Sequence, residues 1–92
     1  MVSAIVLLSV QRDRVNAVAE LLAATEGVSE VYSVAGQHDL VAMVRARDNQ
    51  ALADLVTGRL LPVPGITRTE TLIAFRVYSR YDLEHLFSVG ME

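Results

Sequence analysis

The chain has 92 residues, enough for one domain, and it contains no cysteine, which excludes disulfides, thiolate metal sites and cysteine nucleophiles. Its formal charge of −3 argues against non-specific binding to nucleic acid, because such binding needs a concentrated positive field. Hydrophobic residues make up 52% of the chain, and so high a fraction in a small domain predicts that a second subunit covers part of the apolar surface.

The first half of the chain predicts a strand, a helix and two further strands. An apolar run over residues 2–10 is typical of a strand buried on both faces, and it lacks the basic flank of a signal peptide. Residues 12–26 carry apolar side chains at helical spacing and are followed by a glycine, a frequent helix stop. Residues 28–34 and 40–47 each divide into two alternating sets of side chains, which indicates strands.

The second half predicts a helix, a long strand and a short terminal helix. The first of these begins at a cap formed by Asp48 or Asn49 and continues with apolar side chains on one face. The segment Pro62–Gly65 breaks the chain, and residues 66–78 then have the composition of a long strand. A capping-box pattern predicts the short terminal helix over about residues 80–88.

Together these elements predict a single α+β domain over residues 1–92, with the ferredoxin-like order βαββαβ and an antiparallel sheet. An internal sequence repeat supports this order, because adding 38 to the number of a residue in the first half gives the position of a similar residue in the second half. At this offset Gly27 corresponds to Gly65, and each glycine precedes a predicted strand. Chance similarity between segments rich in Ala, Val and Leu is the alternative explanation.

Both helices of a ferredoxin-like domain pack on one face of the sheet, and the other face needs its own cover. In this chain we expect that face to be apolar, with Val41, Met43, Ile73 and Phe75 among its side chains. No remaining segment is large enough to cover it. The sequence therefore predicts a homodimer that pairs through its sheets, in an assembly of the dimeric α/β-barrel type.

The connection Gly36-Gln37-His38-Asp39 is the most suggestive candidate for a ligand site. Glycine permits close approach to the backbone, whose N–H groups can bind a carboxylate, while Asp39 can bind an ammonium group. Such a connection is suited to a zwitterion. The alternative is an ordinary turn, in which the glycine supplies a positive φ and Asp39 bonds to the backbone.

Other polar residues give weaker indications of chemistry. His38 beside Asp39 could act as a base held by a carboxylate, but neighbours on a strand point to opposite sides, which favours an exposed turn histidine. Asp82, Glu84 and His85 do not supply a set of metal ligands, so no metal site is predicted. No nucleophile motif, phosphate loop or dinucleotide fingerprint occurs, and the sequence predicts no catalytic residue and no cofactor.

Two segments resemble the effector-binding domain of the Lrp/AsnC family of transcriptional regulators, often called the RAM domain. Residues 34–41 contain the family pattern V-x-G-x-x-D between the second and third strands. Residues 61–71 resemble the family's P-G-V-x-x-x-x-T segment, with isoleucine in place of the valine, and lead into the fourth strand. The resemblance covers about residues 2–78, with the two segments separated by one predicted helix.

The resemblance implies subunits that pair through their sheets, rings of dimers that are commonly octamers, and an amino-acid effector bound between dimers. It implies ligand contacts from the loop between the second and third strands, from the turn before the fourth strand, and from two threonines of the facing subunit. The residues at these positions are Gly36, Gln37, His38, Asp39, Pro64, Gly65, Thr69 and Thr71.

Full-length family members carry an N-terminal helix-turn-helix, whereas this chain begins directly at the first RAM strand, so it is similar to stand-alone RAM proteins without direct DNA binding. The expected role is that of a cytoplasmic amino-acid sensor, without membrane contact and without enzymatic activity. It would modulate transcription through partners such as a full-length Lrp/AsnC homologue. The alternatives are a small dimeric α/β-barrel enzyme of the monooxygenase or isomerase type and a purely structural subunit. Neither histidine falls in the middle of a predicted strand, which counts against the enzyme.

Overall fold

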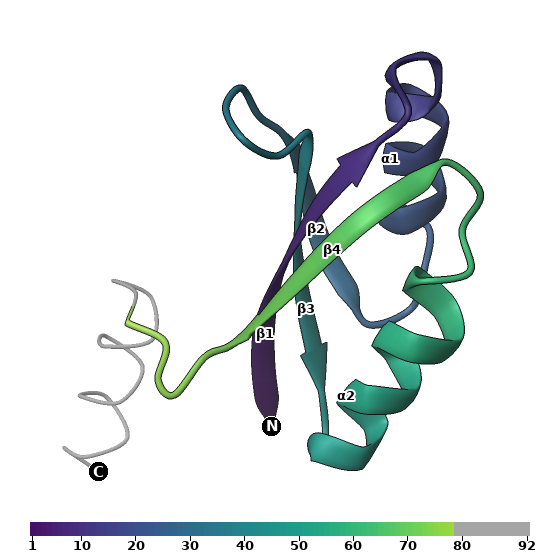
Figure 1. The fold of residues 1–92 in the computed structure, drawn as a ribbon. Helices are drawn as coiled ribbons and strands as arrows, with labels where there is room; N and C mark the ends of the chain where they lie inside the picture. Colours follow the sequence, from purple (N-terminus) through teal and green to yellow (C-terminus); the bar gives the residue numbers. More distant parts are fainter. Residues whose placement is uncertain (79–92) are drawn as a thin grey trace, which may run out of the picture.

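The computed structural model describes residues 1–78, which form one sheet and the helices that cover it (Figure 1). The elements follow the predicted order, with a 3₁₀ turn before the first helix and a π-helical turn after the second. They are β1 (Val2–Val10), η1 (Arg12–Arg14), α1 (Val15–Ala23), β2 (Val28–Ser33), β3 (Leu40–Ala46), α2 (Asn49–Leu55), η2 (Val56–Leu60) and β4 (Ile66–Ile73). The helix predicted near residues 80–88 lies outside the described residues, as does the end of the predicted domain.

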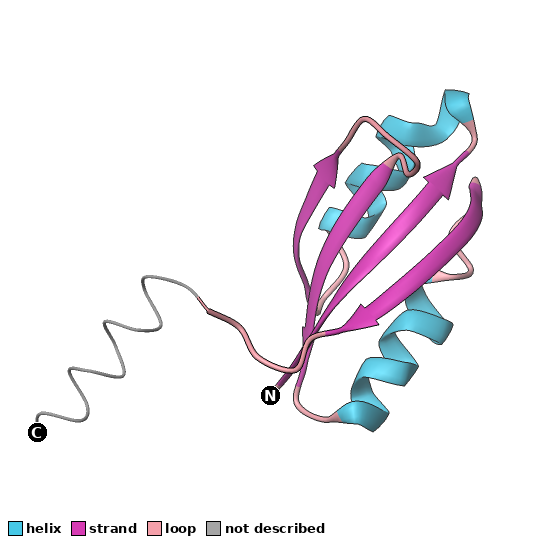
Figure 2. Ribbon diagram, turned by 60° about the vertical axis from the view of Figure 1, so that its left-hand side comes forward, coloured by secondary structure: helices cyan, strands magenta, loops and turns pink. Residues whose placement is uncertain are grey.

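The four strands form one antiparallel sheet in the order β2-β3-β1-β4. β1 lies between β3 and β4 and pairs along both of its edges. One of its faces is buried, whereas the other, which the apolar run predicts to be buried as well, is only partly buried within the described subunit. Both α1 and α2 lie on the same side of the sheet, and within residues 1–78 no helix covers the other face, called here the open face (Figure 2). This arrangement confirms the predicted α+β, ferredoxin-like fold.

The core between sheet and helices is entirely aliphatic in the described part of the chain. Its side chains come from alternate positions of the two central strands and from one face of each helix. The buried residues are Ala4, Val6, Leu8, Val10, Val18, Leu22, Leu40, Ala42, Val44, Leu52, Leu55 and Leu60. The aromatic side chains of the described residues, Tyr32, Phe75 and Tyr78, are all exposed. The large side chains that usually stabilise a core are therefore all outside it.

The first helix is shorter than the predicted span of residues 12–26, since α1 ends at Ala23. The hydroxyl of Thr25 donates to the carbonyl of Leu21 at 2.8 Å, and so occupies an acceptor of the last turn. Gly27 follows with a φ of +97°, a conformation that favours glycine and reverses the chain toward β2.

The second helix begins as predicted, because the carboxylate of Asp48 accepts a hydrogen bond from the N–H of Ala51 at 2.8 Å. After Leu55 the helix widens into the π-helical turn η2, where the N–H of Leu61 donates to the carbonyl of Val56 at 2.9 Å. Leu60, in this wider turn, is fully buried in the core.

β4 ends at Ile73, before the predicted end of the strand at residue 78. Ile73 pairs with Ala4, and the N–H of Ala74 donates to the carbonyl of Ser3 at 2.9 Å. β1 begins at Val2, so the same register offers no partner to residues 77 and 78. The segment 74–78 therefore leaves the sheet (Figure 1).

A β-bulge in β2 changes the predicted faces of this strand. Alternation over residues 28–34 predicts Val31 on the face opposite Val28. The register shifts between Val28 and Glu30, however, and both valines pack against the core. Tyr32 pairs with Val41 and therefore faces the open side.

The structure of β4 likewise corrects two residues of the predicted open face. Phe75 lies beyond the end of the strand and is not part of the sheet. Ile73 is opposite the core residue Ala4 and so lies on the helix side of the sheet, whereas Leu72 is opposite Ile5 and faces the open side. The predicted apolar character of the open face nevertheless holds. Its apolar side chains include Ile5, Leu7, Val41, Met43 and Leu72.

Two neighbouring leucines of α1 test this packing. We expect Leu22→Ala to lower the free energy of unfolding by about 2–5 kcal/mol, because it leaves a cavity in the core. Leu21→Ala is the matched control, since its side chain is 49% exposed on the same helix, and it should cost less than about 1 kcal/mol. Urea denaturation followed by circular dichroism at one protein concentration measures both. Equal losses would contradict the assigned helix face.

Candidate functional site

The connection between β2 and β3 lies at the end of the sheet where β1 finishes (Figure 1). Gly36 has a φ of +139°, which favours glycine, and no atom lies within 4 Å of the position that a Cβ would take. Within the described residues, the N–H groups of residues 36–38 donate no backbone hydrogen bond. The backbone at Gly36 is therefore free to receive a ligand group.

Asp39 anchors this connection to β1. One carboxylate oxygen, Oδ2, accepts a hydrogen bond from the N–H of Val10 at 2.8 Å, and the N–H of Asp39 donates to the carbonyl of Leu8 at 2.9 Å. The sequence leaves open whether Asp39 binds a ligand or the backbone, and the structure assigns one of its oxygens to the backbone. The other carboxylate oxygen of Asp39, Oδ1, accepts no hydrogen bond from residues 1–78.

His38 is half-buried, whereas the sequence favours an exposed turn histidine. Its Nδ1 atom is enclosed and has no hydrogen-bond partner among residues 1–78. A buried polar nitrogen usually has a partner, so this atom is suited to a hydrogen bond with a ligand or with a neighbouring chain. Gln37, beside it, is exposed.

The turn before β4 lies at the same end of the sheet. The carbonyl of Gly65 accepts a hydrogen bond from the N–H of Gln11 at 2.8 Å, directly after β1. Gly65 has a φ of +104°, and an added Cβ would lie 2.9 Å from the Cβ of Arg14. The end of β1 thus brings Pro64 and Gly65 to the same end of the sheet as the connection at residues 36–39.

The two predicted threonines lie elsewhere in the subunit. Thr69 and Thr71 pair with the core residues Leu8 and Val6, and they therefore face the helix side. Thr71 lines an apolar groove of about 210 Å³ between β4 and α2, together with Leu52. One copy does not join these threonines to the loop, and their contact with a ligand held by a facing subunit stays a prediction.

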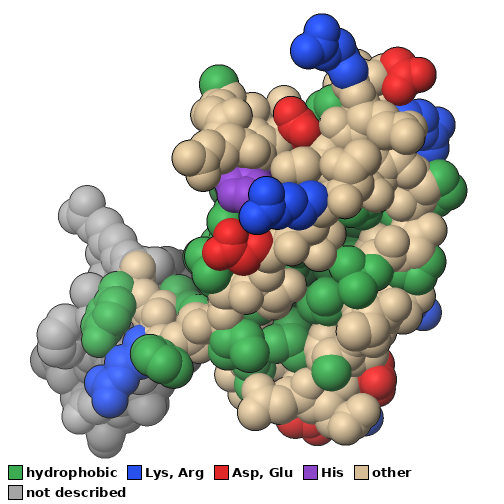
Figure 3. Space-filling model, viewed as in Figure 1, with side chains coloured by type: hydrophobic (Ala, Val, Ile, Leu, Met, Phe, Trp, Pro, Cys, Tyr) green, Lys and Arg blue, Asp and Glu red, His purple; other side chains and the backbone are tan. Residues whose placement is uncertain are grey.

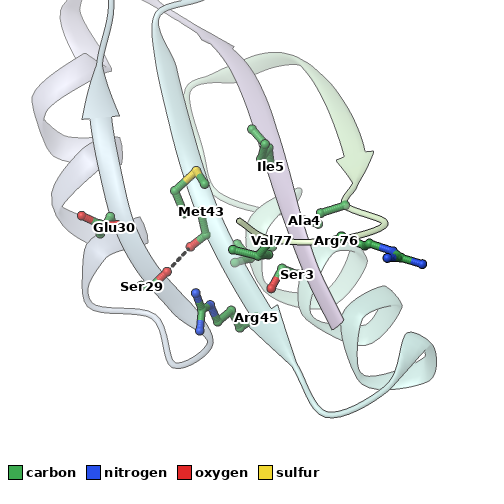
Figure 4. A pocket seen from close by; sticks show the side chains of 11 residues that line it. Ser3, Ala4, Ile5, Ser29, Glu30, Met43, Arg45, Arg76 and Val77 are labelled. Carbon is green, nitrogen blue, oxygen red and sulfur yellow. Dashed lines mark hydrogen bonds between the residues drawn. The ribbon is translucent and has the colours of Figure 1, made fainter. Parts of the chain in front are cut away.

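A second hollow, on the open face, was not predicted from the sequence. It has a volume of about 210 Å³ and lies between the sheet and the segment that follows β4. Figure 4 shows Val77 lying across the sheet near Ser3, with Ile5 on the same strand and Met43 on the neighbouring strand β3. The sequence predicts a strand that continues to residue 78, and such a strand would place Val77 within the sheet. The hollow was therefore not expected.

Tyr32 and Glu30 form a polar pair at the β2 edge. The hydroxyl of Tyr32 donates to a carboxylate oxygen of Glu30 at 2.7 Å. This hydrogen bond, with smaller contributions from desolvation and from the negative charge of Glu30, raises the pKa of Tyr32 above its usual value.

Two negative findings concern residues 1–78 only. This part of the chain contains no group of three or more His, Cys, Asp or Glu residues placed to hold a metal ion. None of its helices has the length and apolar character needed to cross a membrane.

The anchoring role of Asp39 is testable. We expect Asp39→Ala to lower the free energy of unfolding by about 1.5–3 kcal/mol, because the buried end of β1 loses a charged acceptor. Asp39→Asn retains an oxygen that can accept from Val10 and should lose clearly less. Urea denaturation of the two variants measures the difference. Identical losses would mean that the hydrogen bond to Val10 contributes nothing.

Solved structures with the same fold include small proteins of similar length. TTHA0845 from Thermus thermophilus has a TM-score of 0.81 and 49% identity, over 87% of this chain and 100% of that chain. FFRP-DM1 has a TM-score of 0.79 and 32% identity, over 82% and 100%. A transcriptional regulator from Neisseria meningitidis, solved in complex with L-methionine, shares the fold at a TM-score of 0.77 but only 16% identity, over 86% and 53%.

The curated relatives are longer proteins. An uncharacterized HTH-type transcriptional regulator from Pyrococcus horikoshii is 38% identical over 58 residues, which are 63% of this chain and 39% of that protein. The HTH-type transcriptional regulator LrpA from the same organism is 37% identical over 51 residues, 55% of this chain and 36% of that protein. The family model of the Lrp/AsnC ligand binding domain matches residues 3–83. The resemblance seen in two segments is thereby confirmed, and the chain belongs to the Lrp/AsnC family through this ligand-binding domain.

Proposed function

We propose that the chain is an amino-acid sensor that acts as a homo-oligomer in the cytoplasm and modulates transcription. The observation that carries the proposal is the open backbone at Gly36, next to the Asp39 carboxylate, in a domain of the Lrp/AsnC ligand-binding family. The L-methionine bound to the similarly folded regulator from Neisseria meningitidis supports the choice of ligand class.

The chemistry of the loop suits the two charged groups of a free amino acid. The N–H groups of residues 36–38 are unused by the backbone and can bind a carboxylate. Oδ1 of Asp39 can accept a hydrogen bond from the ammonium group, while Oδ2 keeps the loop attached to Val10. The enclosed Nδ1 of His38 is a further polar contact that can discriminate between ligands. Gln37, Pro64 and Gly65 complete the proposed set on this subunit.

The proposed site needs a second subunit. The open face of the sheet is apolar, so two copies can pair through it, and such dimers can assemble further into a ring, for example an octamer. Thr69 and Thr71 of a facing subunit then complete the site. The ligand would thus bind where copies meet.

The downstream partner is proposed to be a protein. The matched region corresponds to only 39% of the regulator from Pyrococcus horikoshii, and a longer HTH-type homologue of this kind is a suitable partner for mixed oligomers. In such a complex the homologue would contact DNA, and this domain would supply the effector response.

The enzyme alternative has less support. Family members among the relatives are transcriptional regulators. His38 lies in a loop, and the hollow on the open face has no histidine or cysteine among the described residues that line it. The carboxylate that lines it, Glu30, is exposed and accepts a hydrogen bond from the Tyr32 hydroxyl, which does not favour a role as a general base.

A screen of the twenty amino acids tests the sensor function. At millimolar concentration at least one of them should raise the melting temperature by several degrees, because a ligand that binds only the native state stabilises it. Differential scanning fluorimetry measures the shift. If none of the twenty changes the melting temperature, the sensor proposal fails.

Two glycine-to-alanine variants test the location of the ligand site. Gly36→Ala places a methyl group in the open approach and strains a positive φ, so we expect the dissociation constant of the stabilising amino acid to rise at least about tenfold. Gly58→Ala also meets no atom within 4 Å but has no positive φ, and it should leave the affinity unchanged. Isothermal titration calorimetry of both variants measures this. Unchanged affinity in Gly36→Ala would place the ligand elsewhere.

A further inference from the structure

We propose that two charged corners of the open sheet face select a second copy of this chain and set the angle at which the two sheets cross. The inference rests on the proposed dimer and adds the side chains that specify it. It follows from the register of the strands and from the signs of the charges around the apolar centre of the face.

The first corner consists of Arg68 and Glu70 on the edge strand β4. Their partners on β1 are Ser9 and Leu7, which alternate with the buried residues of that strand and so face the open side. Both charged side chains are exposed. This corner lies at the end of the sheet where β1 finishes.

The second corner consists of Glu30 on β2 and Arg45 on β3. Glu30 pairs with Met43, and Arg45 pairs with Ser3, so both also face the open side. Both side chains are exposed. The second corner is diagonally opposite the first, at the other edge and toward the other end of the sheet.

Each corner consists of one positive and one negative side chain. At the second corner, Arg76 on the segment that follows β4 lines the same hollow as Glu30 and Arg45. Among residues 1–78 the ion pair is Arg47 with Asp48, at 3.8 Å, so neither corner forms an ion pair within these residues. One carboxylate oxygen of Glu30 accepts a hydrogen bond from the Tyr32 hydroxyl. Figure 3 shows acidic and basic side chains next to each other on the visible surface, near exposed hydrophobic ones. The three other corner charges and the second carboxylate oxygen of Glu30 can therefore pair with charges of a partner.

Two copies are complementary when the first corner of one meets the second corner of the other. A two-fold axis that runs diagonally across the face, between the corners, places Arg68 opposite the partner's Glu30 and Glu70 opposite the partner's Arg45. Neighbouring strands are about 4.8 Å apart, and side chains on one face of a strand repeat about every 6.8 Å. With these spacings, one two-fold axis brings both charge pairs close together.

The same axis makes the strands of the two sheets cross at about a right angle, which is the orthogonal class of sheet packing. The aligned alternatives are less favourable. An axis along the strands brings Arg45 beside the partner's Arg45, and an axis across the strands brings each glutamate near its own copy. Like charges placed opposite each other are strongly unfavourable at an interface, so the charges select the crossed arrangement.

Charge reversal tests the selection. The variant Arg45→Glu with Arg68→Glu makes both corners acidic, and Glu30→Arg with Glu70→Arg makes both basic. Alone, each variant should dimerise at least about tenfold more weakly than the wild type at low salt. An equimolar mixture should form heterodimers with an affinity within about threefold of the wild type, and about 1 M salt should reduce these differences. Analytical ultracentrifugation measures all of these species.

The matched control is Arg12→Glu with Arg59→Glu. It changes the net charge by the same amount as the acidic variant, but at exposed positions of η1 and η2. It should dimerise like the wild type. A dimeric wild type with variants that do not complement each other would overturn the corner proposal alone. A monomeric wild type would overturn the proposed oligomer itself, so the two failures are distinguishable.

The absence of cysteine from the chain permits a second test that does not depend on affinity. With a mild oxidant, Glu30→Cys combined with Arg68→Cys should give a disulfide-linked dimer on a non-reducing gel. Each single substitution should remain uncrosslinked, because a crossed arrangement keeps each position far from its own copy. Single variants that crosslink as fast as the double variant would overturn the crossed geometry.

Discussion

The sheet of this domain is apolar on both faces, but the two α-helices of the described chain cover only one of them. On the covered face, alternate residues of β1 and β3 pack with α1, α2 and η2 into a core without aromatic side chains. On the other face, none of the helices in residues 1–78 lies above Ile5, Leu7, Val41 and Met43. Removal of such a surface from water stabilises association. The proposed oligomer, the shared ligand site and the charged corners all depend on this asymmetry.

The end of β1 organises the candidate site. Val10 is held on one side by the carboxylate of Asp39 and on the other by its pairing with Ile66, next to Gly65. Two segments distant in sequence are thus fixed to the same strand end. The aspartate of the loop has a structural role in addition to the ligand role proposed for it, because it attaches the loop that carries Gly36 to the end of β1.

Much of the fold could be predicted from particular residues. The apolar run of residues 2–10 predicts β1, and the alternation within residues 40–47 predicts β3. These patterns, the cap at Asp48 and the reversal at Gly27 depend on neighbours in sequence, and the structure contains all four features. The predicted face of a side chain was wrong where the pairing between strands determines which side of the sheet it occupies. The bulge after Val28 and the pairing of Ile73 with Ala4 depend on partners that are distant in sequence. The loop at Gly36 was identified, but the hydrogen bond from Val10 to Asp39, across 29 positions, was not.

By itself, the sequence determined the order of elements, the membership in a ligand-binding family and the position of the glycine loop, because periodicity, turn residues and motifs are local properties. Only the tertiary structure decided where β4 ends, that Thr69 and Thr71 face the helices, and that Arg68, Glu70, Glu30 and Arg45 share the open face. The physical reason is strand register. A shift of one residue moves every following side chain to the other face of a sheet, and hydrogen bonds between distant segments fix that shift.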